Sequence, residues 1–345
     1  TFLAAHPGLV QELAASTPYV LDAVVERVPE LGLGLQVLAP DSVGADGRVD
    51  GVAGVAGALT SLGTLTPLFR ETAVRVQPLQ QPRAVPTRPP NGIAEVLDGV
   101  AHQSTGYTRA HGSVGGRLST ADEPPEGVVR LELVTHADGT RAWIVEIPGT
   151  QDWSPLPAGT GTPMDLTTNL RAVAGEDTAT AQAVVQAMRA AAVAPGEPVM
   201  LAGHSQGGLT AAALAADPEV RAEFSITHVL TAGSPIDSIA VPTDVRVLSL
   251  EHTDDVVPAL DGEAARSSPH RTLVRRDIGA VPEFAADVAD DPLTAHGWNG
   301  YLDTAGAVDA SKDTALLAYR DSGSAFFDAP GASVEAFDYR AVRVP

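Results

Sequence analysis

The stretch EPVMLAGHSQGGLTAAALAA, residues 197–216, decides the fold. Its apolar first part predicts a short buried strand, and its alanine-rich second part predicts a helix. Between the two, Gly203 and Gly207 flank Ser205, so the backbone can turn sharply there without Cβ clashes. We therefore expect Ser205 at the carboxyl end of a strand and at a helix N-terminus, where the helix dipole and free N–H groups favour developing negative charge.

The chain around this stretch alternates between strand-like and helical patterns. Two β-rich runs flank Asp138-Gly139, which predicts a hairpin. A helix is expected over 178–194, beginning at a threonine cap. Further strands are expected at 199–203, 226–233, 245–252 and 271–277. Continuous apolar strands that alternate with helices predict an α/β fold, with a mostly parallel sheet covered by helices.

The N-terminal quarter of the chain has a different character. Residues 8–28 show helical spacing, and 76–92 is proline-dense, as in an extended linker or strap. The uncharged segment 51–69 is diluted by Gly, Thr, Ser and Pro, so a buried or cap helix is favoured over a membrane span. We therefore expect an N-terminal helical addition or cap over 1–90 and a catalytic domain over 91–345.

The composition restricts the partners. The chain has 43 acidic residues and 22 basic ones, which gives a net charge of −21. This charge argues against nucleic acid as a partner. The acidity fits a secreted or salt-tolerant protein, and equally a GC-rich genome; the start at Thr1 fits a processed secreted protein or a trimmed one. The chain has no cysteine, and its scattered histidines form no H-E-x-x-H or H-x-x-x-H pair, so neither a metal nor a cofactor is expected.

Ser205 needs a base and an orienting acid to become a nucleophile. Only two histidines lie downstream of the acidic candidates, His270 and His296. His270 stands directly before the strand predicted at 271–277, which places it at the wrong end of the sheet. His296 follows that strand and is therefore the favoured base.

The stretch VLSLEHTDDVVPALDG, from residue 247, supplies the acid. Asp255 is favoured because the Val-Val-Pro after it would anchor the loop, with Asp254 as the main competitor and Glu251 as a third candidate. A calcium-binding loop is the alternative interpretation of this acidic cluster, although the alternating ligand spacing is absent.

The third requirement is a pair of donors for an oxyanion. The backbone N–H of Gln206, directly after the nucleophile, is expected to be one. The second is expected in WIVEIPGTQDW, where Thr150 offers both an N–H and a hydroxyl, with Gln151 as the neighbouring option.

Taken together, these motifs resemble the α/β-hydrolase superfamily, and within it the fungal-type (class 3) lipases, over residues 128–305. The family's GHS-x-GG matches 203–208, and its H-T-x-D-x-V-P matches 252–258 with Asp255 at the catalytic position. The family's histidine precedes a tyrosine by three residues, whereas Tyr301 follows His296 by five. GHSQGG is also similar to cutinase-like and actinobacterial secreted esterases.

The resemblance implies a serine esterase or lipase that acts on a small ester or lipid through an acyl-enzyme, with transient contact to a lipid interface. Ser205, Asp255 and His296 would form its triad. The resemblance does not extend to 1–90, but the aliphatic residues near 51–69 are candidates for a cap or lid over an acyl site. Two alternatives stay open: an acyltransferase using the same triad, and a non-catalytic interaction protein on a hydrolase scaffold.

Overall fold

The structure, a computed structural model, describes residues 51–61, 69–80, 85–104, 114, 117–118, 126–154 and 161–344. The helices expected near 8–28 lie outside these residues. Within the described ranges, no helix has the length and apolar character needed to cross a membrane.

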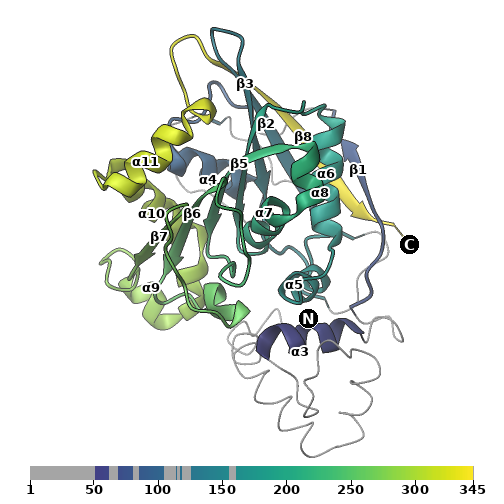
Figure 1. Ribbon diagram of the computed structural model, residues 1–345. Coiled ribbons are helices and arrows are strands. Elements are labelled where there is room, and N and C mark those ends of the chain that lie inside the picture. The colour runs from purple at the N-terminus through teal and green to yellow at the C-terminus, as the bar shows by residue number, and fades with distance from the viewer. Residues whose placement is uncertain are drawn as a thin grey trace, which may run out of the picture.

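An eight-stranded sheet forms the centre of the molecule, with the strand order β1-β8-β2-β3-β4-β5-β6-β7 (Figure 1). The strands from β3 to β7 pair in parallel, whereas β1, β8 and β2 add an antiparallel side. The expected α/β class with a mostly parallel sheet is thus confirmed. The strands are β1 Val74–Pro78, β2 Val128–Thr135, β3 Arg141–Ile147, β4 Pro198–His204, β5 Ser225–Ala232, β6 Arg246–His252, β7 Arg271–Arg276 and β8 Ser333–Arg343.

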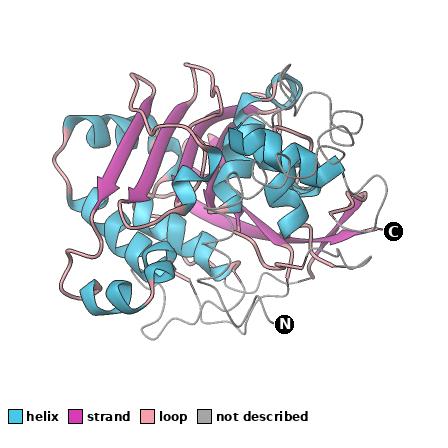
Figure 2. Ribbon diagram, turned by 90° about the horizontal axis from the view of Figure 1, so that it is seen from below, coloured by secondary structure: helices cyan, strands magenta, loops and turns pink. Residues whose placement is uncertain are grey.

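Helices cover both faces of this sheet (Figure 2). The α-helices are α3 Gly51–Ser61, α4 Ile93–His102, α5 Leu166–Val173, α6 Ala179–Ala190, α7 Gln206–Ala216, α8 Pro218–Glu223, α9 Ala285–Asp290, α10 Trp298–Ala310 and α11 Thr314–Ser322. Short 3₁₀ helices are η4 Val257–Asp261, η5 Pro292–His296 and η6 Ser324–Phe326. Helices α6, α7 and α8 pack on one face, and α4, α10 and α11 on the other.

The position of β4 in the sheet explains why its sequence is mostly apolar. Val199 and Leu201 lie in the core under α6 and α7, whereas Met200 and Ala202 lie in the core under α4 and α10. A central parallel strand that is buried on both faces needs apolar residues at every position rather than at alternate ones.

The proline-dense stretch 76–92, expected to be an extended linker or strap, begins as part of the sheet. Residues Val74–Pro78 pair with β8, and Pro78 is tolerated because β1 is an edge strand. A boundary near residue 90 would therefore separate β1 from the other strands of its own sheet. The helix expected within 51–69 is present as α3, which packs beside α5 (Figure 1).

A cluster of charged side chains is buried beneath α4. Arg117 contacts Glu132 at 2.6 Å, and Arg130 contacts Asp338 at 2.7 Å. Glu146 lies 3.8 Å from Arg117, and neither of its carboxyl oxygens has a hydrogen-bond partner among the described residues. Burial, and then repulsion by Glu132, hold the pKa of Glu146 well above its usual value of 4.5. A neutral Glu146 leaves two buried cations balanced by two buried anions.

The neutral form of Glu146 predicts a dependence of stability on pH. The pKa of Glu146 is higher in the folded protein than in the unfolded chain, where it has its usual value of 4.5. Above about pH 4.5, unfolding therefore releases a proton. The free energy of unfolding should consequently fall as the pH rises from about 4.5 through the folded pKa. Glu146→Gln is expected to remove this part of the fall in urea titrations at several pH values. The exposed Glu335→Gln should keep the wild-type dependence; identical pH dependence in Glu146→Gln and wild type would contradict a neutral Glu146.

Candidate active site

The turn between β4 and α7 holds Ser205 in an unusual backbone conformation, with φ 55° and ψ −125°. A non-glycine residue with positive φ costs free energy and persists only where its surroundings enforce it. The backbone on either side of Ser205 is closely packed: a Cβ on Gly203 would lie 2.2 Å from the carbonyl carbon of Gly207, and one on Gly207 would lie 2.1 Å from the carbonyl oxygen of Ile147. The motif's glycines are therefore required by the close approach of α7 to the strand ends.

His296 and Asp255 lie side by side at the same edge of the sheet. The imidazole Nδ1 of His296 is 2.7 Å from Oδ2 of Asp255, whose side chain is fully buried. Two more donors hold this carboxylate: the N–H of Val257 at 2.9 Å and the hydroxyl of Tyr301 at 2.7 Å. Burial alone would raise the pKa of Asp255, but the charge and hydrogen bonds of His296 and Tyr301 outweigh burial and lower it. Asp255 is thus held as an anion that faces His296.

The competing residues have other partners. Asp254 accepts a hydrogen bond from the N–H of Gly279 at 3.0 Å. Glu251 faces Arg271 at 3.7 Å, and burial raises its pKa to about 7. His270 precedes β7 and lies 3.1 Å from the hydroxyl of Ser268. The structure therefore brings Asp255 to His296 and leaves the other candidates apart from it.

Ser205 and His296 line one pocket, with a volume of about 140 Å³. Its lining residues are Ser104, Gly149, Thr150, Gln151, Trp153, His204, Ser205, His296 and Trp298. Within the described part of the chain, no hydrogen bond joins the hydroxyl of Ser205 to His296. Such contacts are often long in unliganded enzymes and tighten when substrate is bound.

Two backbone N–H groups beside Ser205 are available to a ligand. Gln206 is the first residue of α7, where N–H groups lack intrahelical acceptors. Among the described residues, neither its N–H nor that of Thr150 meets an acceptor. The N–H of Gln151, by contrast, donates to the carbonyl of Met164 at 2.7 Å, so the geometry favours Thr150 of the two.

The side chain of Asn169, on α5, joins the two donor residues. Its Nδ2 donates to the hydroxyl of Thr150 at 2.9 Å, and its Oδ1 accepts from Nε2 of Gln206 at 2.8 Å. Asn169 therefore fixes the loop after β3 relative to the start of α7.

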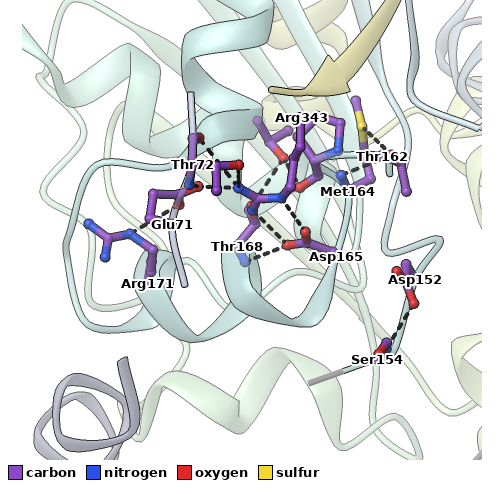
Figure 3. A network of polar contacts seen from close by, with 12 residues as sticks. Glu71, Thr72, Asp152, Ser154, Thr162, Met164, Asp165, Thr168, Arg171 and Arg343 are labelled. Carbon is purple, nitrogen blue, oxygen red and sulfur yellow. Dashed lines mark hydrogen bonds and ion pairs between the residues drawn. The ribbon is translucent and has the colours of Figure 1, made fainter. Parts of the chain in front are cut away.

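A buried ion pair anchors α5 in turn (Figure 3). Asp165 caps this helix by accepting from the N–H of Thr168 at 2.9 Å, and Arg343 of β8 donates to both of its carboxylate oxygens. Arg343 also contacts Glu71, which in turn pairs with Arg171 on α5 at 3.1 Å. Residues far apart in the sequence, Glu71 and Arg343, thus hold the helix that carries Asn169.

Sequence reasoning did not assign Asn169, Tyr301, His204 or His252 to this site. Their contacts join residues 19 to 92 positions apart, as in Asn169 to Thr150 and His204 to His296. The sequence held one signal for Tyr301: it follows His296, although by five residues rather than by the expected three. Side chains of His, Asp and Glu in the described ranges form no group of three or more arranged to hold a metal ion.

Comparisons of the chain with protein-family models, with curated proteins and with solved structures found no match.

Proposed function

We propose that this chain is a serine hydrolase with an α/β-hydrolase fold, which cleaves carboxylic esters through an acyl-enzyme. One observation carries the proposal: Ser205 sits in a strained strand-to-helix turn, in the same pocket as a histidine that is paired with a buried aspartate. The arrangement supports the proposal because an activated serine needs a base and a group that orients the base, and His296 and Asp255 are candidates for these two roles.

In the proposed reaction, Ser205 Oγ attacks the ester carbonyl as Nε2 of His296 takes its proton. Nδ1–H of His296 donates to Asp255, which fixes the tautomer and stabilises the imidazolium. The N–H groups of Gln206 and Thr150 bind the oxyanion. The imidazolium then protonates the leaving alcohol, and water, deprotonated by His296, releases the acid and restores Ser205.

The proposed fold includes the N-terminal addition. Helix α3 packs against α5, and the hydroxyl of Thr60 donates to Glu176 at 2.8 Å. Helix α3 also contacts η4, which follows Asp255. We infer that α3 belongs to a cap that supports α5, the helix whose Asn169 holds the two oxyanion-donor residues.

Hydrolysis of p-nitrophenyl esters from acetate to palmitate tests the proposal. The described pocket, at about 140 Å³, is close to the roughly 150 Å³ cavity known to hold benzene, so we expect turnover of the short acyl esters. The absence of hydrolysis above a Ser205→Ala background for every ester would contradict it. Adding a competing alcohol distinguishes acyl transfer, the second candidate on the same serine, by its ester product. A non-catalytic interaction protein would hydrolyse none of these esters.

Asn169 gives a more specific prediction. Asn169→Ala removes the link between Thr150 and Gln206, so kcat for p-nitrophenyl acetate should fall about 10-fold, less than the 10²–10³-fold typical of removing an oxyanion donor outright. The fall should be smaller in Asn169→Asp, because an aspartate there still accepts from the Thr150 hydroxyl and from Gln206. Equal kcat in Asn169→Ala and wild type would show that the link does not serve catalysis.

A further inference from the structure

The segment that carries His296 is a short 3₁₀ helix, η5, rather than a strand end, so its position depends on what holds its backbone. Two buried imidazoles do so. Nε2 of His204 lies 2.9 Å from the carbonyl oxygen of His296, and Nδ1 of His252 lies 2.7 Å from that of Ala295. A carbonyl oxygen only accepts, so in each contact the imidazole nitrogen is the donor.

The chain of donors behind His252 fixes its tautomer. Arg276, which can only donate, contacts the hydroxyl of Thr304 at 3.2 Å. That hydroxyl is therefore free to donate to Nε2 of His252 at 2.9 Å, which leaves the proton of His252 on Nδ1, facing Ala295. The ring also stacks on Tyr301 with centroids 3.9 Å apart, so the tyrosine that holds Asp255 supports His252 as well.

The surroundings of His204 favour its uncharged form. Its ring lies 4.5 Å from that of His296 and 4.3 Å from that of Trp298. Burial, and then repulsion by His296, lower the pKa of His204 to about 3. A neutral neighbour matters here, because a charged one would oppose the imidazolium that His296 must become during the proposed reaction.

Three adjacent strands therefore meet the His296 segment at their carboxyl ends. His204 ends β4 and His252 ends β6. Gly233, directly after β5, has φ +61°, and a Cβ there would lie 3.0 Å from the ring of His296. The edge of the sheet thus provides two hydrogen bonds to this irregular segment and, at Gly233, the space that the His296 ring occupies.

We propose that His204 and His252 are positioning residues, which hold the carbonyls of residues 295 and 296 and so keep the His296 ring between Asp255 and Ser205. The inference rests on the proposed hydrolase function. Neither residue needs to exchange a proton with substrate, since each acts through the backbone of the base. Misplacement of a catalytic group by about 1 Å can cost on the order of 100-fold in rate.

Exchanging each imidazole for two amides of different length tests this role. An asparagine amide nitrogen lies near the position of Nδ1, and a glutamine amide nitrogen lies near that of Nε2. His252→Asn should therefore keep the donor to Ala295, and His252→Gln should lose it. At position 204 the order should reverse, with His204→Gln keeping the donor to His296 and His204→Asn losing it.

We expect the matching amide to give a kcat for p-nitrophenyl acetate at least about 10-fold above the other amide at each position, with KM within about threefold. Each variant is assayed at a temperature where circular dichroism shows it folded. Opposite preferences at the two positions would support positioning. The same order at both positions, no difference within either pair, or rates that follow the melting temperature alone would overturn it.

Wild-type and Ser205→Ala protein in the same assay separate the two claims. Equal rates for these two proteins mean that the proposed function has failed. A wild-type rate that depends on Ser205, together with amide variants that show no reversal, means that the positioning role alone has failed. Nitrogen-15 spectra of the histidines give an independent readout: His204 should be the uncharged Nε2–H tautomer and His252 the uncharged Nδ1–H tautomer at neutral pH, and any other assignment would overturn the inference.

Discussion

Ser205→Ala is expected to lower kcat for p-nitrophenyl acetate by a factor on the order of 10⁴ or more, because the proposed reaction would lose its nucleophile. Alanine accepts the strained φ of 55° about as well as serine, so the turn and the fold should persist. Activity is measured by release of p-nitrophenol, and folding by circular dichroism. Residual binding of substrate at a similar KM is expected, since the pocket walls are unchanged.

Ser234→Ala is the matched control for this loss. Ser234 is also a buried serine just past a strand end, and its hydroxyl donates to the carbonyl of Ala232 at 3.1 Å. Its replacement should leave kcat within about threefold, because removing a neutral hydrogen bond costs about 1 kcal/mol of stability and touches no reacting atom. Comparable losses in both variants would point to a general disturbance of the sheet edge rather than to a nucleophile.

Arg343→Met is expected to lower the free energy of unfolding by about 3–5 kcal/mol, the usual cost of breaking a buried ion pair from one side. The Arg343 side chain is 1% exposed, and its guanidinium donates to both carboxylate oxygens of Asp165, which the substitution would leave buried without its cation. Burial already raises the pKa of Asp165, and Arg343 opposes that rise. Urea denaturation measures the loss.

Two further variants test the reason for this loss. Arg343→Met with Asp165→Asn should be more stable than Arg343→Met alone, because the unpaired charge is removed. Arg189→Met breaks the exposed pair with Glu223, in which Arg189 is 58% exposed, and should cost less than about 1 kcal/mol. Similar losses for Arg343→Met and Arg189→Met would contradict the importance of the buried pair.

The parallel part of the sheet was predictable from the sequence because central strands are buried on both faces and read as unbroken apolar runs. Strands β4, β5 and β6 lie where expected for this reason. Strand β7 also lies where expected, although it is an edge strand and only partly buried. Strand β8 carries Glu335, Asp338 and Arg340, so it lacks such a run, and β1 ends in a proline. Both form because they complete the antiparallel side, which local sequence does not specify.

The candidate site was predictable where chain order and motif set it. Ser205 lies at the expected turn, and Asp255 and His296 are in contact as expected, while their catalytic roles stay predictions. The choice between Asp254 and Asp255 depends on which of two adjacent side chains faces the interior, and this required the structure. The supports from Asn169, His204 and His252 depend on distant partners, and single-sequence spacing does not encode them.

Labelling with a fluorophosphonate probe tests the central claim, an activated Ser205, most directly, because unactivated serines do not react. We predict one adduct per chain, placed on Ser205 by peptide mass spectrometry, absent in Ser205→Ala and formed far more slowly in His296→Ala. No adduct on folded protein, an adduct on a different residue, or an equal labelling rate in His296→Ala would contradict the account.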